Sequence, residues 1–367
     1  MIPLFRPSVG EEEISALRET FKTGWIGLGP KTAEFEKKFA EYIGVKHAIG
    51  LNSCTAALDL ALRANEFKGG EVLIPAITFV STAHAALYNN LKPVFVDVDP
   101  DTFCIDVEDM KEKITGNTRA VIPVHVGGHP CDMDPIMEVA REKGISVIED
   151  VANATGGEYK GRKLGSIGDM GCFSFEAKKN MTTGDGGMLT TSDSALIDKM
   201  KRLRWVGINK GTWERASSPR YSWQYDVDIL GYKYNMNDIH ATLGLVQLAK
   251  LDRMNEKRRE IAAFYRKELS NEGWLKCPVE KEWAKHVYWL FILKIAERDD
   301  FVEYMSKNGV TTGVHFMPIP LHPLYKNFES KIPVAMDVWK TIVDIPMFPD
   351  LAKTDMQKVV SVIKDFK

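Results

Sequence analysis

The sequence has few cysteines, little net charge and no long hydrophobic run, and each of these absences excludes a class of protein. Its cysteines are odd in number and show no C-x-x-C spacing; they stand at positions 54, 104, 131, 172 and 277. This pattern argues against a disulfide framework and against a zinc site. We therefore expect reduced thiols, no metal centre and a cytoplasmic location.

The charge, the hydropathy and the absence of several known motifs argue against nucleic-acid binding, a membrane location and some common classes of enzyme. The formal net charge is -2, so the chain has no general attraction for nucleic acid or for anionic membranes. The opening residues, MIPLFRPSVGEEE, lack the basic and apolar segments of a signal peptide. No apolar run is long enough to span a bilayer. We also find no Ser-His-Asp spacing, no H-E-x-x-H motif and no Walker-type loop.

What the sequence does contain is an alternation of short apolar runs, typical of buried strands, with segments whose apolar residues recur at helical spacing. The apolar content of 44% is ordinary for a globular protein, and 367 residues correspond to two or three domains. Helices are expected over 82–88 and 133–143, between strands expected at 71–75, 93–98, 120–125 and 146–148. This rhythm predicts an α/β fold with a mostly parallel sheet covered by helices.

The remainder of the chain is more helical. Capping boxes at Ser8–Glu11 and Thr354–Gln357 predict the first and last helices. The segment 207–228 is polar and aromatic without a period, and a loop of this length is often functional. A long charged helix over about 253–270 is expected to lead into a strand at 288–293 and a helix at 299–308. We predict a large α/β domain over 1–250 and a smaller C-terminal α+β domain over 251–367.

The strongest chemical signal lies between residues 146 and 188. A buried strand ends in Glu149 and Asp150, and a second strand is followed by Lys178 and Lys179. In α/β sheets, ligands bind outside the carboxyl ends of the strands. A carboxylate there could keep a ring nitrogen protonated, and a lysine could form a Schiff base. The alternative is an aspartate that caps a helix beside solvated lysines, and spacing does not choose between the two lysines.

Two further stretches suit a phosphate and a ring. The turn Asn52–Thr55 precedes a helix, whose first N–H groups and positive dipole end attract a phosphate, and Ser53 or Thr55 adds a hydroxyl. The alternative is a plain helix cap. Phe79 follows a strand end, where an aromatic side chain could stack on a ring or could belong to the core.

Taken in order along the chain, several stretches resemble the DegT/DnrJ/StrS family of sugar aminotransferases, which depend on pyridoxal phosphate (PLP). They are WIGLGP, FEKKFAEYIG, NSCTAALDLAL, PAITFVSTAHA, VIEDVANATGGEYKGRKLGSIGD, CFSFEAKKNMTTGDGGM, GYKYNMNDIHATLGLVQL and PMFPDL. The resemblance covers nearly the whole chain. It implies a fold-type I PLP-dependent transferase, similar to aspartate aminotransferase, that forms a homodimer with shared active sites.

The resemblance also assigns roles. Lys179, which directly precedes Asn180 and the turn Gly184–Gly187, matches the lysine that forms the Schiff base. Asp150 matches the acid that pairs with the pyridine nitrogen. The remaining matches are the phosphate ligand Ser174, the phosphate turn Cys54, Thr55 and Ala56, and the stacking aromatic Phe79.

This sequence departs from the family pattern at two cofactor positions. Asn153 stands three residues after the acid, where Gln or His is usual, and it is one methylene shorter than Gln for a contact with the ring hydroxyl. In the common run G-Y-N-Y-R, this chain has Lys233 at the position of Asn. We expect Lys233 to meet a phosphate across the dimer.

These assignments predict a PLP-dependent aminotransferase that moves an amino group from glutamate to a keto sugar, linked to a nucleotide, by a ping-pong mechanism. WIGLGP, the segment 207–228 and HFMPIPLHPLY are expected to shape the acceptor pocket, with His315, His322 and Tyr325 as candidate contacts. Two alternatives stay open: a cyclitol or other carbonyl acceptor, and a PLP-binding regulatory protein without turnover.

Overall fold

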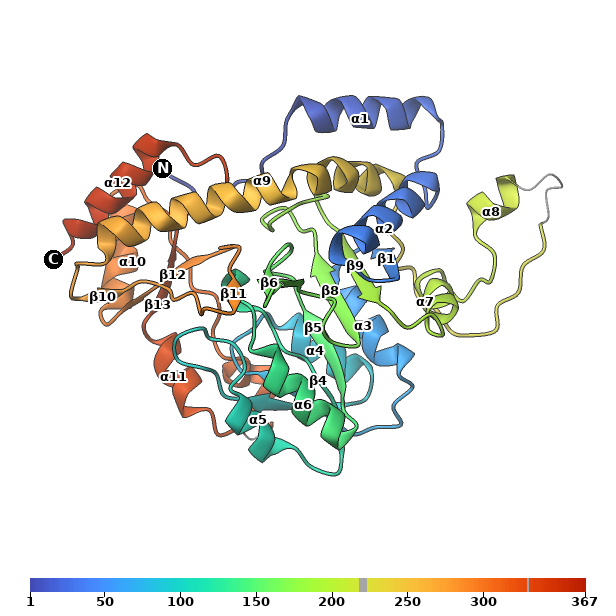
Figure 1. The fold of residues 1–367 in the computed structure, drawn as a ribbon, viewed down its shortest axis with the longest axis horizontal. Helices are drawn as coiled ribbons and strands as arrows, with labels where there is room; N and C mark the ends of the chain where they lie inside the picture. Colours follow the sequence, from blue (N-terminus) through green and yellow to red (C-terminus); the bar gives the residue numbers. More distant parts are fainter. Residues whose placement is uncertain (218–222, 329) are drawn as a thin grey trace.

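The computed structural model describes residues 1–217, 223–328 and 330–367 (Figure 1). Residues 218–222, in the middle of the segment predicted to shape the acceptor pocket, therefore lie outside the described residues. Around them this segment is not wholly irregular, because Thr212–Ser217 form the short helix α8.

Among the described residues, the central sheet has seven strands in the order β1-β9-β8-β5-β4-β2-β3. Neighbours from β8 to β3 are parallel, and β9 runs antiparallel to both β8 and β1. The bounds are β1 (His47–Leu51), β2 (Glu71–Pro75), β3 (Lys92–Val96), β4 (Thr118–Val121), β5 (Ser146–Asp150), β8 (Met170–Ser174) and β9 (Gly187–Thr191). The prediction of an α/β fold with a mostly parallel sheet is confirmed.

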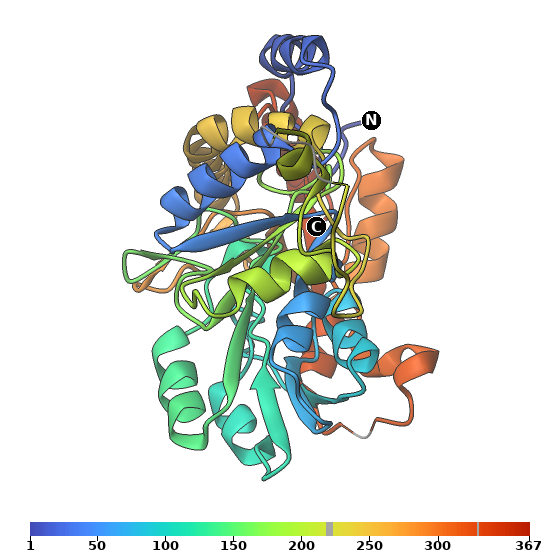
Figure 2. The same cartoon turned by 90° about the vertical axis from the view of Figure 1, so that its right-hand side faces the viewer.

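Helices cover both faces of this sheet, which is why its strands carry near-continuous apolar runs. α3 (Cys54–Ala64) and α4 (Ser81–Tyr88) pack together against one side. α5 (Val107–Lys113) and α6 (Met133–Lys143) form a second pair, and Figure 2 shows the two pairs on opposite sides of the strands.

The longest helix, α9 (Asp238–Leu269), runs without a break through the region where we predicted a new helix to begin. The Asn237 side chain caps its start by accepting a hydrogen bond from the His240 N–H at 2.9 Å. α9 packs against α1 (Glu11–Lys22) and α2 (Pro30–Ile43) and extends toward α12 (Lys353–Lys364) (Figure 1). The predicted domain boundary between residues 250 and 251 falls inside this helix and stays a prediction.

The C-terminal part is a smaller α+β unit, as predicted. Its antiparallel sheet consists of β10 (Leu275–Lys276), β12 (Phe291–Ile295) and β13 (Ile342–Ile345). α10 (Arg298–Lys307) and α12 help to enclose a separate apolar core that includes Phe291, Phe301, Val343 and Ile363.

Shorter elements complete the fold. They are β6 (Glu158–Tyr159), β7 (Arg162–Lys163), β11 (Ala284–Lys285), α7 (Ile197–Arg204), α11 (Pro333–Trp339) and three 3-10 turns at Val126–Gly128, Ile319–Leu321 and Pro323–Tyr325. In the described part of the chain, no helix combines the length and the apolar character needed to cross a membrane.

Three further local predictions were wrong. α1 begins at Glu11 rather than after Ser8, because the Gln247 amide binds the Ser8 carbonyl oxygen at 2.8 Å and Gly10 serves as the cap. α12 begins at Lys353, which places Thr354 inside the helix. The strand predicted over 120–125 ends at Val121, since Pro123 has no N–H to donate to a neighbouring strand.

Candidate active site

A cavity of about 370 Å³ lies where β5 and β8 end. The last residue of each strand, Asp150 and Ser174, lines it. The predicted site residues that share this lining are Cys54, Thr55, Phe79, Asp150, Asn153, Ser174, Lys179 and His315. The fold thus brings together residues from 54 to 315 at the carboxyl edge of the sheet, as expected for a ligand site in an α/β protein.

Asp150 is buried at this edge and is held by two donors. The Thr82 hydroxyl donates to one carboxylate oxygen at 2.9 Å, and the Ala152 N–H donates to the other at 3.1 Å. Burial raises the pKa of Asp150 above its ordinary value, although both hydrogen bonds and the nearby Lys179 charge act in the opposite direction. A buried carboxylate of this kind favours a cationic partner, such as a protonated ring nitrogen.

Lys179 and its neighbour Lys178 both border the cavity, and Lys178 is the more exposed of the two. The Lys179 amine donates to the Asn153 side-chain oxygen at 2.7 Å and lies 3.7 Å from the centroid of the Trp289 ring. Burial lowers the pKa of Lys179 to about 8, although the Asp150 charge opposes this shift. A substantial fraction of the amine is therefore neutral near pH 8, and a neutral amine is a nucleophile and a base.

The N-terminus of α3 forms another wall of the cavity. Ser53 caps this helix by accepting from the Ala56 N–H at 3.1 Å, while Cys54 and Thr55 line the cavity. Gly187 permits this arrangement, since a Cβ at that position would lie 2.4 Å from the Ser53 carbonyl group. The first N–H groups of a helix lack partners within the helix and make a ready phosphate site.

Aromatic rings and a histidine close the outer side. Phe79 is 56% exposed and lies 6.0 Å from Phe316 between ring centroids. The His315 Nδ1 pairs with the fully buried Asp344, and the ring borders the cavity. Phe79 is thus placed to cover a planar group, and His315 presents a polar edge beside it.

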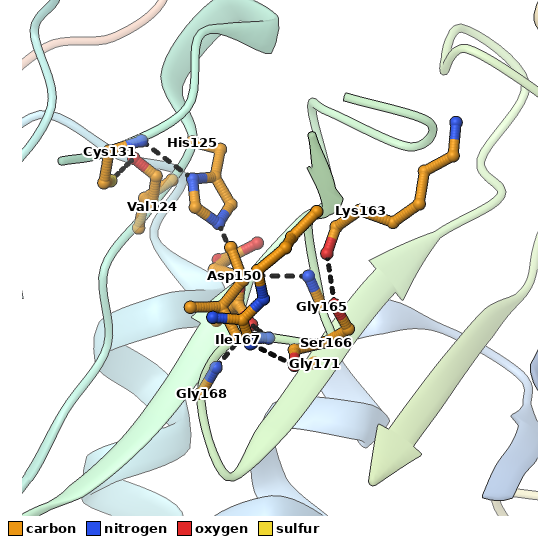
Figure 3. Close-up of polar contacts among 12 residues, drawn as sticks. Val124, His125, Cys131, Asp150, Lys163, Gly165, Ser166, Ile167, Gly168 and Gly171 are labelled. Carbon is orange, nitrogen blue, oxygen red and sulfur yellow. Dashed lines mark hydrogen bonds and ion pairs between the residues drawn. The ribbon is translucent and has the colours of Figure 1, made fainter. Parts of the chain in front are cut away.

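Glu149, which precedes Asp150, belongs to a different network, whose members His125, Gly165, Ile167 and Gly168 are labelled in Figure 3. Its fully buried carboxylate accepts from the N–H groups of Gly165, Ile167 and Gly168 at 2.7 to 2.9 Å. The His125 Nε2 lies 3.2 Å from the same carboxylate, and the His125 Nδ1 accepts from the Cys131 N–H. This network fixes the end of β5 and thereby the position of Asp150.

Replacing Glu149 by glutamine is expected to lower the free energy of unfolding by about 2–4 kcal/mol, because an amide cannot accept all of these hydrogen bonds. Burial alone would raise the pKa of Glu149, but His125 and the backbone N–H groups outweigh it and lower the pKa. The stabilisation is therefore present above the ordinary carboxyl pKa of about 4.3 and is lost as the pH falls further. Urea unfolding measures the change, with the exposed Glu142→Gln as control. A loss as small as that of the control would contradict this account.

Four of the predicted site residues do not line this cavity. Ala56 sits inside the first turn of α3, where its N–H binds Ser53. Lys233 lies over the Trp205 ring, 3.1 Å from its centroid. His322 and Tyr325 border a neighbouring cavity of about 400 Å³ that shares Phe79 with the first one, and the buried Tyr325 hydroxyl lies 3.1 Å from the His84 Nδ1. Their predicted roles stay predictions.

The structure adds site residues that sequence reasoning missed. Thr82 follows Phe79 by three residues, so helical spacing could have placed its side chain beside the same ring site. Trp289 lies in a run that was interpreted only as a strand, and Asp344 lies in another buried strand. Nothing in the sequence around these two residues points to the cavity.

A larger cavity of about 630 Å³ lies between residues 28–36 and the segment from α7 to Trp213. Three of its charged groups are already paired: Glu36 pairs with Arg204, and Arg202 pairs with Asp228, which lies outside the lining. It brings no lysine to a buried carboxylate, as far as the described residues go. We therefore place the chemistry in the smaller cavity.

Comparison with known proteins identifies the family of the chain over nearly its whole length. The sequence model of the DegT/DnrJ/EryC1/StrS aminotransferase family matches residues 7–364. This chain belongs to the DegT/DnrJ/EryC1/StrS aminotransferase family. It is 41% identical to the spore coat polysaccharide biosynthesis protein SpsC of Bacillus subtilis, over 99% of this chain and 96% of SpsC.

Solved structures of the family superpose on nearly the entire chain. The sugar aminotransferase CalS13 from Micromonospora echinospora matches with a TM-score of 0.92 and 32% identity, over 100% of each chain. The PLP form of Spr1654 from Streptococcus pneumoniae matches with a TM-score of 0.92 and 30% identity, over 99% of this chain and 98% of that one. The predicted family and the fold-type I architecture are confirmed.

The residues at the cavity fit the cofactor of this family. Asp150 is a buried carboxylate that a protonated ring nitrogen would stabilise. Lys179 is an amine of lowered pKa, and the N-terminus of α3 offers N–H donors for a phosphate. The chain is a PLP-dependent aminotransferase.

Proposed function

We propose that this aminotransferase moves the amino group of glutamate to the ketone of a nucleotide-linked sugar in two half-reactions at one site. The observation that carries this proposal is the placement of Lys179 and Asp150 in one cavity beside the N-terminus of α3. PLP bound there supplies an electron sink for the carbon that loses its proton.

Lys179 is the group that moves protons. Its amine lies within hydrogen-bonding distance of Asn153, and its pKa of about 8 suits both accepting and returning a proton near neutral pH. Asp150 stabilises a protonated ring nitrogen, and Thr82 and Ala152 hold the carboxylate in place. Ser174 and the N-terminus of α3 bind the phosphate group.

His315 is the best-placed contact for the acceptor among the three candidates. Its Nδ1 pairs with Asp344, so the rest of the ring is oriented toward the cavity. His322 and Tyr325 border the adjoining cavity, which suits a more distant part of a large acceptor. This second compartment supports an acceptor larger than a simple keto acid.

The active form is a homodimer with shared sites. On α1, the side turned toward α9 is polar: Glu13 pairs with Lys250, and Thr20 contacts Thr242 at 2.7 Å. Ile14 and Phe21 are instead 44% and 55% exposed, and Figure 2 shows α1 standing apart at one end of the molecule. A second copy of the chain would cover this apolar face, which supports the dimer.

Replacing Lys233 by alanine is expected to weaken PLP binding about tenfold, because a lysine that meets the phosphate across the dimer supplies a charge-assisted hydrogen bond. The dissociation constant is measured by absorbance titration of the dimer. Lys210→Ala removes a lysine from the same region as a control. Unchanged affinity in Lys233→Ala would exclude this contact.

The proposed function is tested by initial-velocity kinetics with glutamate and a panel of acceptors. Parallel lines in double-reciprocal plots, with nucleotide-linked keto sugars as the best acceptors, are expected. Intersecting lines would contradict the ping-pong mechanism. Preference for a cyclitol ketone would move the acceptor outside the nucleotide sugars, and a protein that binds PLP without turnover would support the regulatory alternative.

A further inference from the structure

The amine of Lys179 rests on the face of a tryptophan ring. The distance from the Lys179 Nζ to the Trp289 ring centroid is 3.7 Å. Trp289 is only 3% exposed, and it lies at the start of the chain leading into β12, far in sequence from the lysine. At this distance the ring attracts an ammonium group, and tryptophan offers the most favourable face for such a contact.

The indole ring is held on several sides. Its Nε1–H donates to the carbonyl oxygen of Lys178 at 2.8 Å, which ties it to the backbone directly before Lys179. Phe5 stacks on it with ring centroids 5.6 Å apart and an interplanar angle of 11°. His315 meets its edge at 5.5 Å. Trp289 therefore presents a fixed surface rather than a mobile side chain.

The other surroundings of the amine determine what this surface does. The Asn153 oxygen accepts from the Nζ at 2.7 Å, and the Asp150 charge also favours the ammonium form. Burial opposes both and lowers the pKa of Lys179. The amine is thus held between the Asn153 oxygen and the face of the Trp289 ring. Both the ammonium and the neutral form of the amine are accessible at this position.

We propose that Trp289 is a positioning residue that holds the Lys179 amine beside the cofactor site whenever this amine is not bonded to the cofactor. The inference rests on the proposed function and deepens it, since each half-reaction needs the released amine to carry a proton. A lysine has four rotatable side-chain bonds, and a free one would leave the reacting carbon. The ring limits that freedom without a hydrogen bond that would occupy the amine lone pair.

The first test uses the full chain without PLP. Cyanate modifies neutral amines, so the pH dependence of its reaction with Lys179, resolved by mass spectrometry, gives the pKa of that amine. We expect Trp289→Leu to lower this pKa by about one unit and Trp289→Phe to lower it less, because a smaller aromatic face is retained. The exposed Lys178 serves as an internal reference, and Trp283→Leu, which removes a ring packed on Tyr159 and His129, is the control variant.

The second test uses the PLP-loaded enzyme. We expect Trp289→Leu to lower kcat about tenfold with little change in KM for glutamate, and to raise the kinetic isotope effect of α-deuterated glutamate. An unchanged pKa of Lys179 in both Trp289 variants would overturn the proposal. If the leucine variant does not fold, the phenylalanine variant decides alone. The pKa measurement does not require turnover, so it separates a failure of this inference from a failure of the proposed function.

Discussion

Replacing Lys179 by alanine is expected to lower the rate of amino transfer by at least about 10⁴-fold, since the variant loses both the covalent attachment of the cofactor and the group that moves the proton. The fold should persist, because the side chain points into a cavity rather than into the core. The rate is measured as keto acid formed from glutamate in single-turnover experiments.

Lys178→Ala is the matched control for this prediction. Lys178 borders the same cavity but is exposed, and its hydrogen bonds with Glu176 and Trp289 use backbone atoms that alanine retains. We expect the control to keep more than about half of the activity, since surface substitutions rarely perturb a site. If both lysine variants retained similar activity, Lys179 would not be the proton-transferring residue.

Replacing Asp150 by asparagine is expected to lower kcat by about 10²–10³-fold. A neutral amide does not stabilise the protonated ring nitrogen, and the bound cofactor then accepts electrons less readily. The amide has nearly the same shape, so Thr82 can still donate to its oxygen and the cavity should remain intact. Steady-state kinetics measure the loss of kcat, and the visible spectrum of the PLP-loaded variant reports the change at the ring nitrogen.

Thr82→Val provides a graded comparison for the aspartate variant. It removes one of the two hydrogen bonds to the carboxylate and leaves the charge in place. Its loss of activity should be about tenfold, which corresponds to one hydrogen bond to a charged group. An asparagine variant no worse than Thr82→Val would show that the charge of Asp150 contributes little to catalysis.

The central pair of the site could be predicted because strand ends are visible in a sequence. Asp150 closes a short apolar run, and Lys179 follows another, so both were expected at the carboxyl edge of the sheet. The choice of Lys179 over Lys178 came from the family resemblance. The structure shows a difference between the two lysines: Lys178 borders the cavity but is exposed, whereas the Lys179 amine contacts Asn153 and Trp289.

Trp289 and Asp344 could not be predicted in the same way, because their roles depend on contacts between distant parts of the chain. Trp289 is 110 residues from Lys179, and the chain beside it is held by hydrogen bonds from the Val287 and Leu290 N–H groups to the carbonyl oxygens of Gly128 and Gly127. Asp344 is noticeable only once β13 places it beside His315. Sequence patterns report burial and periodicity, whereas these contacts arise from packing between elements.

Helix boundaries were missed for a similar reason. The box at Ser8–Glu11 has the right residue types, yet the Gln247 amide binds the Ser8 carbonyl oxygen and α1 starts later. Likewise α9 continues through residue 253, where Met254 is buried and Asn255 donates to the Thr155 carbonyl oxygen, and nothing in its local sequence requires a break. Tertiary contacts decided both cases.

The most direct test of the account is the visible absorbance spectrum of the purified protein with PLP, recorded before and after glutamate is added. We predict a yellow band that fades on addition of glutamate, with release of one keto acid per site, and no such band with Lys179→Ala. A band that ignores glutamate and every other amino donor would contradict aminotransferase chemistry at this cavity. The absence of any band in the unmodified protein would contradict the assignment of Lys179 and Asp150 as the cofactor site.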